Sequence, residues 1–124
     1  MDLRYFGIRV TDLEQSLDFY TRLLGLKLKN KGRMYHDGRW VLLEDPRTHQ
    51  RLELNWYPKD SPYATKYVPG DGLDHIGFTV SDPASKFAKL VKAGVEPALA
   101  PDDVSGVRGV YYVKDPDGNW IEFF

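Results

Sequence analysis

The chain has 124 residues, 42% of them hydrophobic, and a formal net charge of −1 at pH 7. This composition is typical of one globular domain with its own core, and it excludes the strong charge excess of proteins that bind nucleic acid or acidic membranes. There is no cysteine, no apolar run near the roughly 18 residues of a membrane span and no signal peptide, so we expect a cytoplasmic protein without disulfides or thiolate chemistry.

The first segment belongs to an internal repeat. "LRYFGIRVTD" (3–12) and "LDHIGFTVSD" (73–82) align at an offset of 70 residues, and leucine, glycine, valine and aspartate recur between them. The exchange that matters for chemistry is Tyr5 in the first copy against His75 in the second.

The first half reads as strand, helix and three strands. Thr11 and Glu14 form a capping box, and Gly25 ends the predicted helix. Its inward-facing residues recur at helical spacing: Leu13, Leu17, Tyr20 and Leu24. Strands are predicted at 27–31, 39–44 and 50–57, with a hairpin signal "HDGR" (36–39) and an Asp-Pro turn "EDPR" (44–47) between them.

The second half repeats this order. Pro83 suits the first position of a helix, and Gly94 is its predicted end. The expected inward face of the helix carries Phe87, Ala88 and Val91. Strands follow at 96–100, 109–114 and 120–124, and the offset between the halves changes from 70 at the Asp-Pro turns to 69 at the last strands.

Each half is therefore a βαβββ module of about 55 residues, which is too small to be stable alone. We expect an α+β protein with a single domain (1–124), in which a first module (about 1–57) and a second module (about 73–124) pack together. Between them, residues 58–72 form a connector with three prolines and two glycines.

Strand alternation separates a core face from a second face of each sheet. On the first and last strand of each half, the second face carries carboxylates and a histidine together with large aromatic rings. Examples are Glu53, His75, Trp120 and Glu122. A ligand cavity needs this mixture, although an exposed sheet face or a dimer contact would also fit. Glu53, His75 and Glu122 supply the oxygen and nitrogen donors that a catalytic divalent cation needs, and a structural histidine with unrelated glutamates is the alternative.

Four segments carry a family resemblance: "GIRVTDLEQSLDFYTRLLGLKL", "LELNWYP", "LDHIGFTVSD" and "DPDGNWIEFF". They resemble the vicinal oxygen chelate superfamily, above all its glyoxalase I (lactoylglutathione lyase)-like members, over essentially the whole chain. The resemblance implies an eight-stranded cleft, a homodimer and a divalent metal (Ni, Co, Zn, Mn or Fe). Its ligand positions correspond to Tyr5, Glu53, His75 and Glu122.

Tyr5 departs from the pattern, because the usual residue at its position is histidine or glutamine. A neutral phenol is a poor metal ligand unless the metal converts it to phenolate. Three interpretations stay open. Tyr5 ligates as phenolate, or it hydrogen-bonds a metal-bound water, or it marks a site that has lost its metal.

The function implied first is a glyoxalase-like lyase or isomerase that acts on a 2-oxoaldehyde thiol adduct through an enediolate. By analogy Glu122 moves the proton. Arg9 matches the arginine that holds the carboxylate of the thiol cofactor, with a surface arginine as the alternative. Tyr57 stands where glutathione-using members have asparagine, which leaves the identity of the thiol open.

Two other functions remain. An extradiol dioxygenase needs two histidines and a carboxylate around Fe(II), but Tyr5 removes one, and His36 and His49 are expected to be exposed. A metal-free drug-binding protein of the bleomycin-resistance type would use an aromatic cleft, for which the candidate rings are Trp40, Tyr57, Tyr111, Trp120 and Phe124. For Trp40 and Tyr111 we favour packing in the core or at a dimer contact. The retained carboxylates argue against a metal-free pocket.

Overall fold

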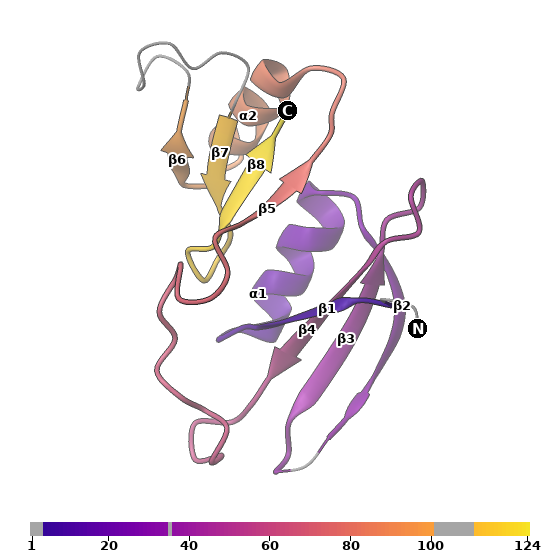
Figure 1. Cartoon of the computed structure of the whole chain (residues 1–124), viewed down its shortest axis with the longest axis vertical. Helices are drawn as coiled ribbons and strands as arrows, with labels where there is room; N and C mark the ends of the chain where they lie inside the picture. The colour runs from indigo at the N-terminus through magenta and orange to yellow at the C-terminus, as the bar shows by residue number, and fades with distance from the viewer. Residues whose placement is uncertain (1–3, 35, 101–110) are drawn as a thin grey trace. The chain divides into compact units, whose positions relative to one another are not determined.

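The computed structural model describes residues 4–34, 36–100 and 111–124. The chain divides into two compact units, Met1–Tyr67 and Val68–Phe124. The boundary falls inside the segment 58–72 that the sequence indicates as the connector. Figure 1 follows the chain through both units.

The first unit holds one mixed sheet of four strands and one helix. Its elements are β1 (Phe6–Arg9), α1 (Leu13–Asp18) with a π-helical turn (Phe19–Leu23), β2 (Lys27–Arg33), β3 (Arg39–Glu44) and β4 (Arg51–Trp56). The strand order is β1-β4-β3-β2. β1 runs parallel to β4, and the other two pairs are antiparallel, so the first strand of the unit pairs with its last.

The second unit repeats this topology. Its elements are β5 (His75–Phe78), α2 (Pro83–Lys92), β6 (Pro97–Leu99), β7 (Tyr111–Lys114) and β8 (Trp120–Phe123). The order is β5-β8-β7-β6, with β5 parallel to β8. The prediction of two βαβββ modules in an α+β fold is confirmed. Residues 109 and 110 of the predicted strand 109–114 lie outside the described residues.

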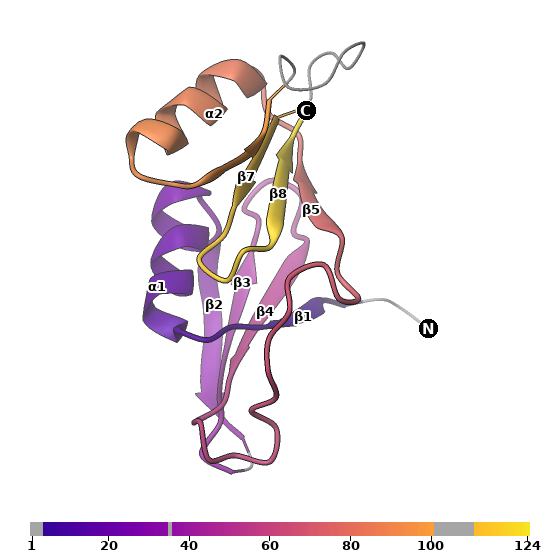
Figure 2. The ribbon, with the colours of Figure 1, turned by 90° about the vertical axis from the view of Figure 1, so that its left-hand side faces the viewer.

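In each unit the helix covers one face of the sheet, as Figures 1 and 2 show. The buried side chains on that face include Leu43 and Leu54 in the first unit and Val113 and Ile121 in the second. The alternation therefore assigns the core face correctly on these strands. Phe6 is an exception, because it is 65% exposed although it shares a face with buried Ile8 and Val10. We call the face opposite the helix the site face of each sheet.

Aspartate caps both helices. The Asp12 carboxylate accepts a hydrogen bond from the Gln15 backbone N–H (2.9 Å), and Asp82 accepts one from Ser85 (3.0 Å). The predicted capping box at Thr11 is therefore wrong by one residue, because Asp12 is an equally good cap and lies nearer to the first helical turn. Pro83 begins α2 as expected. The predicted ends, Gly25 and Gly94, have φ values of 89° and 92°, the left-handed conformation that suits glycine.

The inward faces of the helices differ from the prediction. After Asp18 the first helix continues as a π-helical turn, which adds a residue per turn and brings the neighbours Phe19 and Tyr20 inward together. Leu17 and Leu24 are only half-buried.

The second helix also departs from the expected pattern. Leu90 is buried, and the ring of Phe87 packs against that of Tyr111 at 5.5 Å between centroids. Ala88 and Val91 are exposed, so of the expected face only Phe87 points inward. Of the described residues, no helix is long and apolar enough to cross a membrane.

The change of offset from 70 to 69 arises in the Asp-Pro turns. In the first unit the N–H of His49 donates to the carbonyl of Asp45, whereas in the second the N–H of Gly118 donates to Asp115, one residue closer. His49 and Gly118 both have positive φ, 59° and 89°. The first turn therefore holds one extra residue, and the strands on either side keep equivalent places.

Candidate functional site

The parallel pair β5–β8 forms the centre of the candidate site. Its register sets His75 beside Trp120 and Gly77 beside Glu122. The intervening residue Ile121 is buried on the core face, so all four side-chain positions lie on the site face. Strand alternation predicted this placement for His75, Trp120 and Glu122.

His75 lies between two carboxylates. Its Nε2 is 3.2 Å from Oε2 of Glu122, and its Nδ1 is 2.6 Å from Oδ1 of Asp74. The Glu122 side chain is 17% exposed, the His75 side chain 37%, and Asp74 is almost fully exposed. Because an ionised carboxylate only accepts hydrogen bonds, a proton on Nδ1 would satisfy the contact with Asp74, and Nε2 is the nitrogen that faces Glu122.

Tyr112 holds the other oxygen of Glu122. Its hydroxyl donates a hydrogen bond to Oε1 at 3.1 Å, and its ring contacts the His75 ring edge-on at 5.7 Å between centroids. Burial, followed by the adjacent Glu122 carboxylate, raises the pKa of Tyr112 above its usual value. The phenol therefore stays protonated and serves as a donor near neutral pH.

Aromatic rings flank Glu122 on its own strand. A Cβ at Gly77 would lie 3.0 Å from Cε1 of Phe124 and 3.4 Å from Oε2 of Glu122, so glycine leaves room for the Phe124 ring beside the carboxylate. On the other side, the Trp120 ring packs against Tyr112 at 5.3 Å. Both Trp120 and Phe124 keep large exposed areas, at 39% and 52%. The carboxylate thus lies among rings that a ligand could contact.

The equivalent position in the first unit is Glu53 on β4. It pairs with Gly7 on one side and with Leu42 on the other. Glu53 is half-buried and, among the described residues, makes no hydrogen bond or ion pair. Tyr5 directly precedes β1 and is 46% exposed.

The predicted metal positions therefore fall two in each unit, and the structure brings His75 and Glu122 together. Within the described part of the chain, no group of three or more histidine and carboxylate side chains could hold a metal.

The predicted substrate-binding residues Arg9 and Tyr57 meet in the first unit. The Arg9 guanidinium lies over the Tyr57 ring at 5.2 Å, and its Nη1 donates to the Thr65 hydroxyl at 2.7 Å. Tyr57 in turn contacts Tyr63, and Tyr63 contacts His36. The start of the connector is thereby tied to the sheet. Trp120, the third predicted substrate residue, belongs to the second unit.

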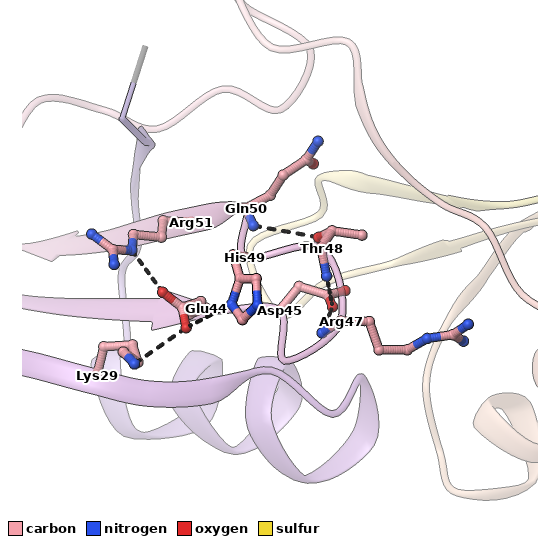
Figure 3. A network of polar contacts seen from close by, with 8 residues as sticks. All are labelled: Lys29, Glu44, Asp45, Arg47, Thr48, His49, Gln50 and Arg51. Atoms are coloured by element: carbon pink, nitrogen blue, oxygen red, sulfur yellow. Dashed lines mark hydrogen bonds and ion pairs between the residues drawn. The ribbon is translucent and has the colours of Figure 1, made fainter. Parts of the chain in front are cut away.

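A second polar cluster surrounds Glu44 at the end of β3 (Figure 3). Glu44 is 7% exposed, and its carboxylate contacts Arg51 Nε at 2.8 Å, Lys29 Nζ at 3.2 Å and His49 Nδ1 at 3.4 Å. The hydrogen bond from Arg51, together with those from Lys29 and His49, lowers the pKa of Glu44 to about 2. This cluster joins three elements of the sheet, and we interpret it as structural. His49 is exposed, as predicted.

Sequence reasoning missed three of these residues: Asp74, Tyr112 and Glu44. The signal for Tyr112 was present, because Val113 has the pattern of a core residue and its neighbour must then face the other way. What the pattern could not supply was the register that places Tyr112 opposite Glu122.

The donor set on β5 and β8 fits a divalent cation. Nε2 of His75 and Oε2 of Glu122 face one another at 3.2 Å, and either a proton on Nε2 or a cation that both atoms ligate accounts for this approach. The contact of Nδ1 with Asp74 is the kind of carboxylate contact that orients metal-binding histidines.

Residues 2–123 match the family model described as the Glyoxalase/Bleomycin resistance protein/Dioxygenase superfamily. The chain belongs to this superfamily. The paired βαβββ units are its fold, as the sequence resemblance implied. A superfamily member of this kind can be an enzyme or a binding protein, so the relatives become informative.

Several relatives of this superfamily member are named lactoylglutathione lyases. That of Neisseria meningitidis serogroup A is 31% identical over 130 residues, covering 99% of this chain and 89% of the relative. A probable lactoylglutathione lyase of Synechocystis sp. is 33% identical and covers 98% and 93%. These similarities support a glyoxalase-like function.

Solved structures share the fold of this chain. The trypanothione-dependent glyoxalase I of Leishmania major has a TM-score of 0.78 at 29% identity, covering 100% of this chain and 86% of that one. The fosfomycin resistance protein FosX of Listeria monocytogenes has a TM-score of 0.74 at 16% identity (98% and 91% covered). An antibiotic binding protein from Streptomyces sp. CB03234 has a TM-score of 0.68 at 23% (99% and 94%). The last two similarities show the fold alone.

Proposed function

We propose that this chain is a metal-dependent, glyoxalase I-like lyase that isomerises the adduct of a 2-oxoaldehyde with a thiol. The observation that carries the proposal is the approach of His75 Nε2 to Glu122 Oε2 on the site face, with Asp74 on the far nitrogen of the imidazole. This pair has the donor atoms of a catalytic divalent metal site, and the Asp74 carboxylate is a partner that can orient the imidazole.

His75 and Glu122 would hold the metal, and Glu53 is the further ligand position that the family resemblance implies. A divalent cation bound there would supply Lewis acidity toward the oxygens of the substrate. Tyr5, which is 46% exposed, would be a phenolate ligand or a hydrogen-bond donor to a metal-bound water, or it marks a site that has lost its metal. The identity of the metal within the set Ni, Co, Zn, Mn and Fe is a matter for titration.

Glu122 is the group that we assign to proton transfer. In the isomerisation, its carboxylate takes the proton from the carbon that bears sulfur, the electron pair moves toward the neighbouring carbonyl, and an enediolate results. The same proton then returns to the neighbouring carbon. The hydroxyl proton of the sulfur-bearing carbon moves to the former carbonyl oxygen, the sulfur-bearing carbon becomes the thioester carbonyl, and no external acid, base or oxidant is consumed. The Glu122 side chain is 17% exposed, and the Phe124 ring lies beside its carboxylate at Gly77.

Arg9, Tyr57 and Trp120 would bind the rest of the small-molecule substrate. The Arg9 guanidinium suits an anionic group of the thiol, and it already lies over the Tyr57 ring. Because Tyr57 replaces the asparagine of glutathione-using members, the thiol need not be glutathione. We also propose a homodimer, with a mass in solution of about twice the 14.3 kDa of one chain.

One alternative has structural support. The exposed rings of Trp120 and Phe124 would serve equally in a metal-free protein that binds an aromatic drug. An extradiol dioxygenase is less well supported, because it needs a second histidine. Tyr5 stands at the position of one, and His36 contacts Tyr63 while His49 contacts Glu44.

The proposal is tested first by the metal content of protein purified without chelator, followed by titration with Ni(II), Co(II), Zn(II), Mn(II) and Fe(II). We expect near one metal per chain, loss of binding in Glu122→Gln and isomerisation of methylglyoxal–thiol adducts. Tighter binding in Tyr5→His would identify Tyr5 as a weak or absent ligand. If the parent protein binds none of these metals, the lyase proposal fails and a metal-free binding protein becomes the favoured function.

A further inference from the structure

The two halves of the repeat treat their glutamates differently. On the site face, the residue paired with Glu53 on the neighbouring antiparallel strand is Leu42, and the residue paired with Glu122 is Tyr112. Glu53 has no hydrogen-bond partner among the described residues, whereas Glu122 accepts a hydrogen bond at Oε1 and has a close contact with His75 at Oε2. Beside the exchange of Tyr5 for His75, the hydroxyl of Tyr112 is thus a chemical difference between the two positions.

We propose that Tyr112 is a positioning residue that makes Glu122 present a single oxygen, Oε2, to the site. Its hydroxyl occupies Oε1 at 3.1 Å, and the remaining oxygen then faces His75 Nε2 at 3.2 Å. Without the hydroxyl, the plane of the carboxylate would turn about the last bond of the side chain at little cost, and neither oxygen would keep a fixed direction toward His75. The orientation of the carboxylate by Tyr112 does not depend on the proposed function. Only the use of the oriented oxygen, to bind metal and accept the proton, rests on it.

The surroundings of Tyr112 support a role for the hydroxyl beyond packing. Its ring already makes apolar contacts with His75 and Trp120, and phenylalanine would retain both. The Oε1 atom lies in a half-buried carboxylate, where a hydrogen bond to a charged acceptor is stronger than one in water. Tyr112→Phe therefore removes the orienting contact and leaves the packing.

The chain provides a matched control on the same strand. Tyr111 is adjacent in sequence but lies on the opposite face, where its ring packs against Phe87 of α2. Tyr111→Phe removes the same atom from the same strand without affecting Glu122. Any general effect of a lost phenol on β7 appears in both variants, and an effect on the site appears only in Tyr112→Phe.

The first measurement needs no metal. The chain has three histidines, so the ring ¹⁵N resonances of His75, His36 and His49 can be assigned by single substitutions in metal-free protein at one pH. We expect the chemical shifts of the His75 ring nitrogens to change in Tyr112→Phe, because the Glu122 carboxylate no longer keeps a fixed orientation toward Nε2 of His75. Those of His36 and His49 stay in place, and Tyr111→Phe changes none.

The second measurement uses Co(II) as the probe. We expect Tyr112→Phe to weaken Co(II) binding about tenfold, to alter its visible absorption, and to lower kcat about tenfold with KM within a factor of about two. Unchanged His75 resonances or unchanged Co(II) affinity in Tyr112→Phe would overturn the proposal. If the parent binds no metal, the lyase function fails, while the resonances still decide the role of Tyr112.

Discussion

Glu44 shows how one buried carboxylate organises its neighbourhood. Side chains from β2, from β4 and from the turn between β3 and β4 contact it. Among the described acidic residues, its pKa is shifted the most. Its pKa falls from 4.5 to about 2 on folding, chiefly through the hydrogen bond from Arg51. The ionised form is therefore favoured in the folded state and must be present for the cluster to contribute to stability.

A pH dependence of stability follows from this shift. A group with a depressed pKa stabilises the fold above its unfolded value and loses that contribution as the pH falls through its folded value. We expect the unfolding free energy to decline as the pH falls from about 4.5 toward about 2, which chemical denaturation at several pH values would measure. Glu44→Gln should unfold at a lower temperature near neutral pH and lose much of this acid sensitivity.

The control for Glu44 is Glu14, an exposed carboxylate whose side chain lies 3.6 Å from Arg39. Exposed pairs of this kind contribute little, so Glu14→Gln should resemble the parent at every pH. If Glu44→Gln kept the full acid sensitivity of the parent, the decline would have to be assigned to other carboxylates.

At the scale of elements, the helix caps offer a direct comparison. Asp82 caps α2 through the Ser85 N–H, while Ser81, one residue earlier, is exposed. We expect Asp82→Ala to cost about 1 kcal/mol of unfolding free energy and Ser81→Ala less than about 0.5 kcal/mol, as measured by denaturant unfolding. Equal costs would mean that the cap is shared between the two residues.

The elements also show how far sequence reasoning extends. Alternation and the repeat predict the strands closely, because the buried residues of a strand recur at every second position. The cap of α1 was missed, since Thr11 and Asp12 are both good caps and only the backbone selects one. The inward face of the same helix was missed, because the π-helical turn at Phe19 interrupts the 3.6-residue period.

Contacts across strands were the harder part of the site. The sequence indicates that His75 and Glu122 share a face, but their 3.2 Å approach depends on the register of β5 against β8. The hydrogen bond of Tyr112 depends on the register of β7 in the same way. Register is set by packing between distant segments and by turn length, which the pattern of one strand does not contain.

At the scale of the whole molecule, the family resemblance adds Glu53 of the first unit to the proposed metal ligands His75 and Glu122. We expect Glu53→Gln, which alters only the first unit, to weaken Co(II) binding at least about tenfold, as Glu122→Gln does in the second. Isothermal titration of both variants beside the parent would measure this. Parent-like affinity in Glu53→Gln would mean that His75 and Glu122 bind the cation without the first unit.

The parallel pairing within each unit has a consequence for the order of folding. Phe6 pairs with Leu52 and Ile76 pairs with Ile121, so the first strand of each unit must wait for the last. The antiparallel meander that ends each unit closes shorter loops and should assemble earlier. His75 lies on a strand that docks late, and Tyr5 directly precedes another. A folding intermediate would therefore carry a nearly finished sheet while the imidazole of His75 was still apart from Glu122.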